Sequence, residues 1–147
     1  MISQSSDSKP AALPNLHDGN LVGIVLVDHQ CTLFISDAVG LMHTITLRGV
    51  ERLRAEDFLE GNIVLDLTVQ TGSVVNEADV LYALSIDEDM AENHRVYVDK
   101  MLGRIGRGEL HLFELASSYG CTVASVCAEV VADAAVDRAS VVHRLGL

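Results

Sequence analysis

The sequence predicts an α+β domain in which a mainly antiparallel sheet of about six strands packs on one long helix, with a short helix beside it. Residues 21–50 contain three β-branched, apolar segments separated only by short groups of turn-forming residues. Residues 109–131 repeat this pattern, and residues 90–105 carry apolar side chains at helical spacing. Strands joined by tight turns pair in antiparallel fashion, and a helix with one narrow apolar stripe needs a surface to cover.

The first block is expected to form three strands. Residues 21–27 are apolar on both alternating faces, which predicts a central strand covered on both sides, and Gly23 indicates a bulge. Residues 31–35 and 43–47 alternate, which predicts one buried and one wetter face. The side chains expected to face the core are Cys31, Leu33, Ile35, His43, Ile45 and Leu47. A lone histidine in such a register is more often a core residue with a satisfied hydrogen bond than a ligand.

In the middle of the chain the spacing of apolar residues changes from that of a strand to that of a helix. Residues 50–58 are expected to form a loop or a single helical turn, and residues 63–69 a half-buried strand. The strand groups Ile63, Leu65, Leu67 and Val69 on one face. Asn76 is a candidate N-cap for a short helix, with a strand over residues 80–86 as the alternative. The long helix is expected to bury Val98, Met101, Leu102 and Ile105.

The last block predicts a C-terminal hairpin. Its arms, residues 110–116 and 121–131, flank a turn in which Gly120 can adopt the positive φ of a tight reversal. Small Ala, Ser and Cys side chains line the second arm. They predict close packing beneath a bulky element such as the long helix.

A chain of 147 residues fits one domain. We expect a flexible arm at residues 1–15, a single α+β domain at 16–132, and a C-terminal tail at 133–147 whose pattern selects neither helix nor strand. The first dozen residues resemble neither a secretory signal nor a basic transit peptide, and no run approaches the ~20 apolar residues of a membrane span. The three cysteines include no CxxC pair and lie in apolar surroundings, which predicts buried thiols in a reducing compartment, a bacterial-type cytoplasm.

A formal net charge of −11 disfavours binding to nucleic acid, because the chain would repel a phosphate backbone. Such acidity is ordinary for a soluble protein, but it also suits a basic protein partner. Acidic side chains gather in two groups outside the predicted strands, at residues 51–60 and 87–92. The predicted binding face is the second group, Asp87, Glu88, Asp89 and Glu92.

The sequence contains no strong catalytic pattern. His17 and Asp18 are adjacent, but a metal site needs three or four converging ligands and the other histidines are scattered. Residues 117–119 offer hydroxyl groups without a nucleophile motif, and the glycines at 103–108 end a helix instead of preceding one. We therefore predict no catalytic residue, no metal and no cofactor. A small hydrolase or metal-dependent enzyme that uses His17 and Asp18 is the alternative.

Four short turn motifs carry a resemblance to known proteins. They are Leu16-His17-Asp18-Gly19, Gly49-Val50 with Leu53, Gly61-Asn62-Ile63, and Ser118-Tyr119-Gly120-Cys121. Across residues 16–131 the chain resembles small single-domain bacterial proteins of largely unknown function, some of which are grouped with immunity proteins of polymorphic toxin systems. The resemblance implies an α+β fold and a non-enzymatic role in binding a cognate toxin or another protein. It carries over no catalytic residue.

These observations predict a non-catalytic protein-binding module, immunity-like, that recognises a basic toxin or another basic partner by surface complementarity. A self-associating structural protein, such as a homodimer, is a further alternative, because strand edges and an apolar content of 49% often accompany a subunit interface. Neither nucleic acid nor a membrane is expected among the partners.

Overall fold

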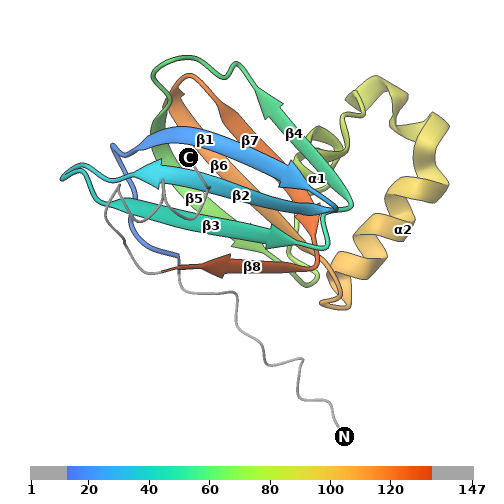
Figure 1. Ribbon diagram of the computed structural model, residues 1–147. Helices are drawn as coiled ribbons and strands as arrows, with labels where there is room; N and C mark the ends of the chain where they lie inside the picture. The colour runs from blue at the N-terminus through green and yellow to red at the C-terminus, as the bar shows by residue number, and fades with distance from the viewer. Residues whose placement is uncertain (1–12, 134–147) are drawn as a thin grey trace, which may run out of the picture.

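The computed structural model describes residues 13–133, which form an α+β fold (Figure 1). The elements are β1 (Asn20–Val27), β2 (Gln30–Ser36), β3 (Met42–Arg48), β4 (Arg52–Glu56), β5 (Ile63–Gln70), α1 (Glu77–Leu84), the 3-10 helix η2 (Glu88–His94), α2 (Arg95–Gly106), β6 (His111–Tyr119), β7 (Thr122–Cys127) and β8 (Glu129–Ala132). The predicted fold class is confirmed, but the sheet has eight strands where about six were predicted.

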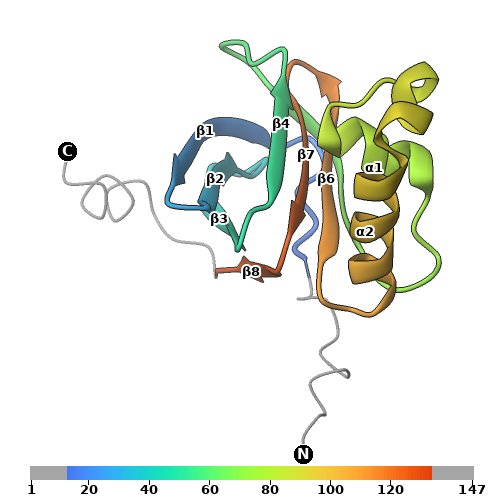
Figure 2. The same ribbon diagram turned by 90° about the vertical axis from the view of Figure 1, so that its right-hand side faces the viewer.

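The strands are ordered β4-β7-β6-β5-β1-β2-β3-β8, and all the pairings between them are antiparallel. Figure 2 shows that the sheet folds over into two layers, with β1, β2 and β3 in one and β4, β7 and β6 in the other. Helices α1 and α2 cover the outer face of the second layer. The layers meet where β5 pairs with β1 at a single residue pair, Asn20 and Ile63, and where the chain passes from β7 into β8 through Ala128.

Two apolar cores follow from this layering. The first lies between the two strand layers and contains Leu33, Ile35, Ile45, Leu47, Phe113 and Leu115, all fully or almost fully buried. The second lies between α1, α2 and the strands β6 and β7, where Ala124 and Val126 pack beneath the helices. A fully buried side chain of this size contributes about 1.5–3 kcal/mol to folding. The predicted inward register of β2 is confirmed. The small residues predicted beneath the helices are confirmed only in part, since Ala124 packs there whereas Cys121 and Cys127 lie in the first core.

The helices form for the local reasons that the sequence suggested. The side chain of Asn76 accepts a hydrogen bond from the backbone N–H of Ala78 (2.8 Å), so it caps α1 as predicted, and a strand over residues 80–86 is wrong. The predicted helix over 90–105 is divided into η2 and α2. The division follows burial: in η2 only Ala91 is buried, whereas α2 buries Val98, Met101 and Ile105. A segment with so little to bury gains little from continuing the α-helix.

Strand β4 corrects the prediction of a loop or a helical turn at residues 50–58. Each residue of β4 pairs with β7, from Arg52 opposite Val126 to Glu56 opposite Thr122. The strand was not predicted because its side chains are charged. In the structure the Arg52 and Arg54 side chains donate hydrogen bonds to carbonyls of α1, at 3.4 and 3.3 Å. An edge strand with alternating charges looks like a solvated loop when its partner strand is unknown.

The prediction that strand β1 is covered on both sides is wrong. Val22, Val25, Leu26 and Val27 are 38%, 41%, 53% and 59% exposed. The predicted bulge is present, since the register with β2 shifts between Leu21 and Gly23. Its pairing with β5 ends at Asn20. Within residues 13–133, most of β1 therefore pairs with β2 on one edge and with no strand on the other.

Bulges also change the predicted face of β5. The register with β6 shifts on both sides of Val64, which is fully buried, while Ile63 and Leu65 are exposed. The predicted grouping therefore fails in the first half of the strand, because an inserted residue reverses the alternation. In β3, Thr44 is buried where it was expected outward, and its hydroxyl donates to Asp133.

The C-terminal hairpin is confirmed, with a correction. Gly120 adopts φ +83° between β6 and β7, but the second arm bends at Ala128, whose N–H donates to the carbonyls of Arg48 (2.9 Å) and Gly49 (3.2 Å). Strand β8 then pairs with β3. Most of the predicted arm at 1–15 and of the tail at 133–147 lies outside the described residues.

The side chain of Asn62 joins three parts of the chain at the corner between the layers. Its Nδ2 donates to the carbonyls of Leu21 (3.1 Å) and Leu59 (2.7 Å). Its Oδ1 accepts from the backbone N–H of Leu59 (2.8 Å) and of Cys121 (2.9 Å). The residue is 2% exposed, so each of these backbone groups would lose its partner without gaining water if the amide were removed.

We expect Asn62→Ala to lower the free energy of unfolding by about 3 kcal/mol, because it leaves several buried backbone groups without a hydrogen bond. Urea unfolding followed by circular dichroism measures the loss. The matched control is Asn93→Ala, an exposed asparagine whose side chain donates only a long bond to the sulfur of Met90 (3.7 Å). It should change stability by less than about 0.5 kcal/mol. Equal losses in the two variants would show that the corner does not depend on this amide.

Candidate functional site

Two adjoining hollows lie where β4 begins, and Arg52 lines both. The first, here called the η2 groove, has a volume of about 350 Å³ and is lined by Arg52, Leu84, Ile86, Asp87, Met90 and Tyr97. The second, here called the β1–β4 hollow, has a volume of about 540 Å³. Its walls are the end of β1, the turn after it, and residues 50–53.

The η2 groove exists because the chain reverses between α1 and η2. Ser85 adopts a left-handed conformation (φ 59°), and its N–H and that of Ile86 bond back to the carbonyls of Tyr82 and Leu81. This reversal ends α1 and turns η2 and α2 back along it. Met90 and Tyr97 remain partly exposed beside the gap, so the groove presents apolar surface to solvent.

The β1–β4 hollow is more polar at its rim. Asp28 and His29 form the two-residue turn between β1 and β2, and both have positive φ (50° and 63°). This conformation is held by hydrogen bonding, since the N–H of Val50 donates to the carbonyl of His29 (2.8 Å). Leu26 and Leu53 supply apolar surface, while Glu51 and Arg52 supply charge.

The predicted acidic face divides into two parts. Asp87, Glu88 and Asp89 are exposed at the start of η2, and in the part of the chain that the structure describes none of them forms an ion pair. Glu92 instead contacts Arg95 at 3.1 Å. Of the four predicted residues, Asp87 therefore lines the groove, and Glu88 and Asp89 are exposed directly after it in the chain.

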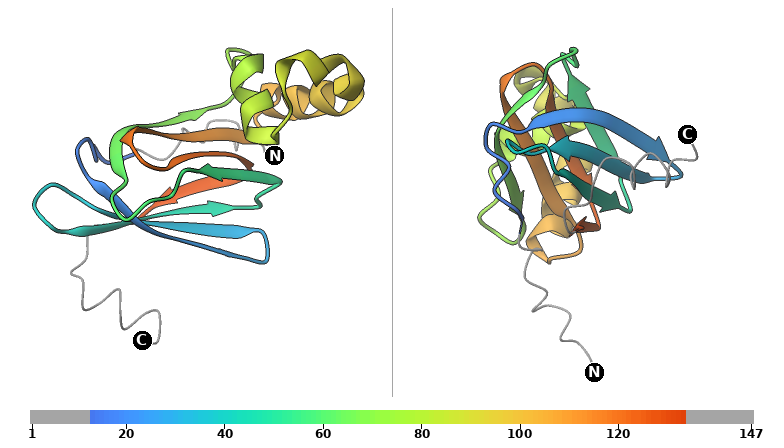
Figure 3. Two further views of the ribbon diagram at one scale, coloured as in Figure 1. Left: turned by 90° about the horizontal axis from the view of Figure 1, so that it is seen from above. Right: turned by 60° about the vertical axis from the view of Figure 1, so that its left-hand side comes forward.

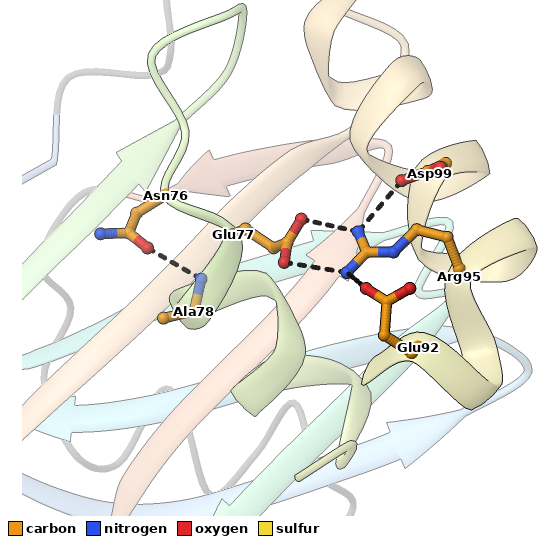
Figure 4. Close-up of polar contacts among 6 residues, drawn as sticks. All are labelled: Asn76, Glu77, Ala78, Glu92, Arg95 and Asp99. Carbon is orange, nitrogen blue, oxygen red and sulfur yellow. Dashed lines mark hydrogen bonds and ion pairs between the residues drawn. The ribbon is translucent and has the colours of Figure 1, made fainter. Parts of the chain in front are cut away.

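Glu92, the fourth acid, belongs to a network of ion pairs around Arg95. Its guanidinium lies 2.9 Å from Glu77, 3.1 Å from Glu92 and 3.2 Å from Asp99 (Figure 4). The hydrogen bond from Arg95 lowers the pKa of Glu77, and the carboxylates raise the pKa of Arg95. These contacts link the start of α1 to the start of α2. Glu92 therefore helps to hold the two helices together and also adds negative charge to the surface.

The His17–Asp18 pair gains no further ligand. The His17 Nε2 lies 3.6 Å from Asp18, both side chains are exposed, and the other ring nitrogen of His17 lies 2.9 Å from the carbonyl of Leu65. Among residues 13–133 no group of three or more His, Cys, Asp or Glu side chains could hold a metal ion. The pair thus belongs to the turn that leads into β1.

A second histidine-carboxylate pair was missed by the sequence reasoning. His43 Nε2 lies 2.9 Å from Asp37 Oδ2, and Asp37 Oδ1 accepts from the N–H groups of Val39 (3.0 Å) and Leu41 (2.9 Å). The hydrogen bond from His43 and those from the backbone lower the pKa of Asp37. The signal was available, because an aspartate at the start of a turn commonly binds the backbone two residues on. His43 is half-buried and hydrogen-bonded, as the prediction of a satisfied histidine required.

Tyr82 fixes α1 to β4. Its hydroxyl donates to Glu56 (2.7 Å), which also contacts Arg54 (3.0 Å), and the Arg54 guanidinium lies 4.1 Å from the centre of the Tyr82 ring. Burial, together with the Glu56 carboxylate, raises the pKa of Tyr82 to about 12. Tyr82 therefore stays protonated and acts as a hydrogen-bond donor, so this cluster is structural.

The remaining motifs are also structural. The Ser117 hydroxyl donates to the carbonyl of Gly120 and lies 3.0 Å from the hydroxyl of Thr122, so it closes the β6–β7 turn. Gly103 and Gly106 lie within α2, and Gly108 (φ 78°) follows its end. The glycine run therefore ends a helix, as predicted.

The three cysteines are free and buried, as predicted. Burial raises the pKa of all three thiols, that of Cys31 to about 11 and that of Cys127 to about 12. Thiols in this state are packing groups and not nucleophiles.

Comparison of the chain with protein-family models, with curated proteins and with solved structures finds no match. Within residues 13–133, none of the helices has the length and apolar content required to cross a membrane. The resemblance to immunity-grouped proteins therefore stays a prediction.

Asp37→Asn should lower stability at neutral pH. A carboxyl whose pKa is lower in the folded state stabilises the fold above its unfolded pKa of about 3.9, and loses that contribution as the pH falls through the folded value. The variant should therefore differ from wild type at pH 7 and converge with it at strongly acidic pH. Urea midpoints measured across this range test the prediction, with exposed Asp66→Asn as the control. A constant difference at every pH would contradict the ionic origin.

The native thiols should react very slowly with Ellman's reagent at pH 8, because they are buried and almost fully protonated. In urea all three should react rapidly. A Val39→Cys variant, which places a thiol on the exposed β2–β3 turn, provides the positive control and should add one fast-reacting group. Rapid modification of the native wild-type protein would contradict the assignment of the cysteines to the core.

Proposed function

We propose that this chain is a non-catalytic protein-binding module that binds a cationic, amphipathic segment of a partner protein in the η2 groove. The observation that carries the proposal is an apolar groove lined by the exposed carboxylate of Asp87, with two more exposed carboxylates, Glu88 and Asp89, directly after it at the start of η2. A segment with lysine or arginine side chains on one face and apolar side chains on the other satisfies both features at once.

The apolar part of the groove suits an adaptable contact. Among its lining residues Leu84 is buried and Ile86 partly buried, whereas the flexible side chain of Met90 and the amphipathic ring of Tyr97 are more exposed. Methionine adjusts to differently shaped partners, and tyrosine provides a large contact area at low entropic cost. These residues would contribute most of the affinity, since burial of apolar surface is the main favourable term in association.

The charges would act chiefly on the rate and selectivity of binding. The chain carries a net charge of −11, so it attracts cationic partners over a distance and repels acidic ones. Carboxylates on a rim steer encounter and weaken with salt, but each contributes only about 0.2–1 kcal/mol at equilibrium. A basic toxin bound in an immunity-like manner in the cytoplasm is one partner with this chemistry, and the proposal extends to other basic proteins.

The test uses a labelled amphipathic peptide of alternating lysine and leucine residues, whose binding to the whole protein is followed by fluorescence anisotropy at several salt concentrations. The variant Asp87→Asn, Glu88→Gln, Asp89→Asn should weaken binding about tenfold and flatten its dependence on salt. The variant Tyr97→Ser should weaken binding and leave the salt dependence unchanged, because it removes apolar contact area and no charge.

The matched control removes three carboxylates elsewhere, by Asp57→Asn, Glu60→Gln and Asp66→Asn. It should retain most of the affinity, since it changes the net charge equally but leaves the groove intact. The same loss in both triple variants would show that only total charge matters. Unchanged binding in the first variant would exclude this face.

A further inference from the structure

Within residues 13–133, strand β1 has a free edge. Its ladder with β5 consists of Asn20 opposite Ile63, with one further bond from the Leu21 N–H to the carbonyl of Asn62 (2.8 Å). Beyond Leu21 no described residue pairs with this side of β1, although its other side pairs with β2 up to Val27. Figure 3 shows β1 and β2 on the side of the molecule away from α1 and α2.

The free edge is also apolar. Val22, Val25, Leu26 and Val27 are all exposed, and residues 20–27 include no charged side chain. An exposed apolar strand with an unpaired backbone edge is a template for a further strand. The apolar side chains on both sides of the backbone would lose their contact with water on pairing.

The two terminal edges of the sheet are protected against such pairing. Strand β4 carries Arg52, Arg54 and Glu56, and β8 has only four residues and carries Glu129. Charged side chains and short length are the usual means by which an edge strand avoids association. Strand β1 has neither of these protections, so pairing with a further strand has the lowest free-energy cost at this edge.

We propose that β1 pairs with β1 of a second copy of this chain, antiparallel and about a two-fold axis, so that two sheets become continuous. A two-fold axis through an antiparallel pair matches a strand with itself. With Ile24 on the axis, Val22 of one copy lies opposite Leu26 of the other, and Asn20 and Leu21 stay paired with β5 and Asn62. This register brings no like charges together.

The charge of the molecule favours a second copy at this strand over other faces. Two chains of net charge −11 repel each other, and the repulsion is smallest where the contact is uncharged. One strand pair buries less than the ~1,600 Å² of a standard interface, so the dimer should be weak and form only at high protein concentration. The interface is separate from the η2 groove, so either proposal can fail alone.

Sedimentation equilibrium of the whole protein, from about 10 µM to about 1 mM, tests the proposal. The mass should rise from 15.8 kDa towards twice that value, and amide exchange across residues 20–27 should slow at the higher concentrations. The variant Val25→Lys, Val27→Lys should weaken dimerisation at least tenfold, because four ammonium groups then gather on one side of the paired strands. Added lysines reduce the net negative charge, so a general charge effect would strengthen association instead.

The control variant Val39→Lys, Val96→Lys adds the same charge at two exposed valines outside β1 and should dimerise at least as well as wild type. Circular dichroism and urea unfolding establish that both variants are folded. A monomer at every concentration overturns the proposal, as does a dimer that survives the β1 lysines. Protection of residues 20–27 that is already complete at low concentration also overturns it, because another part of the same chain would then occupy the edge.

Discussion

The fold depends on the buried amide of Asn62, which is committed on both its nitrogen and its oxygen to backbone groups from three segments. A single asparagine thereby fixes the start of β5, the start of β1 and the β6–β7 turn relative to one another. Within residues 13–133 the pairing of β1 with β5 is limited to Asn20 opposite Ile63, so this corner sets the angle between the two strand layers. The same angle separates β1 from β5 beyond Leu21, and so produces both the open edge of β1 and the hollow between β1 and β4.

A second corner closes the opposite side of the layers. Gly49 adopts φ +62°, and a Cβ there would lie 2.8 Å from the Cβ of Ala128, so the bend between β7 and β8 requires glycine. Gly120 is constrained similarly, because a Cβ would lie 2.7 Å from the carbonyl oxygen of Gly61. The motifs that carry the resemblance to immunity-grouped proteins thus coincide with the corners of the fold.

Local signals were sufficient for part of this structure. The alternation of Cys31, Leu33 and Ile35 and the cap at Asn76 depend on neighbouring residues, and both are as predicted. Strand β4 was missed because its partner β7 lies about seventy residues further along the chain, and the exposure of β1 depends on where β5 turns away. The acidic side chains were visible in the sequence. The contact of Glu92 with Arg95 spans only three residues, so it was also a local signal. That Asp87 lines an apolar groove depends on distant elements, because Arg52 of β4 and Leu84 of α1 form the groove with Met90 and Tyr97.

The use of the arginines bears on the binding mode that we propose. Arg48, Arg54, Arg95, Arg104 and Arg107 each contact a carboxylate. Arg52 instead donates to the carbonyl of Leu84 at the end of α1, and it stands between the two hollows. Under the proposed function, the cations of a bound segment would lie beside the carboxylates of η2 and away from this guanidinium, because like charges repel. A segment that continued into the second hollow would meet carboxylates again, those of Asp28 and Glu51.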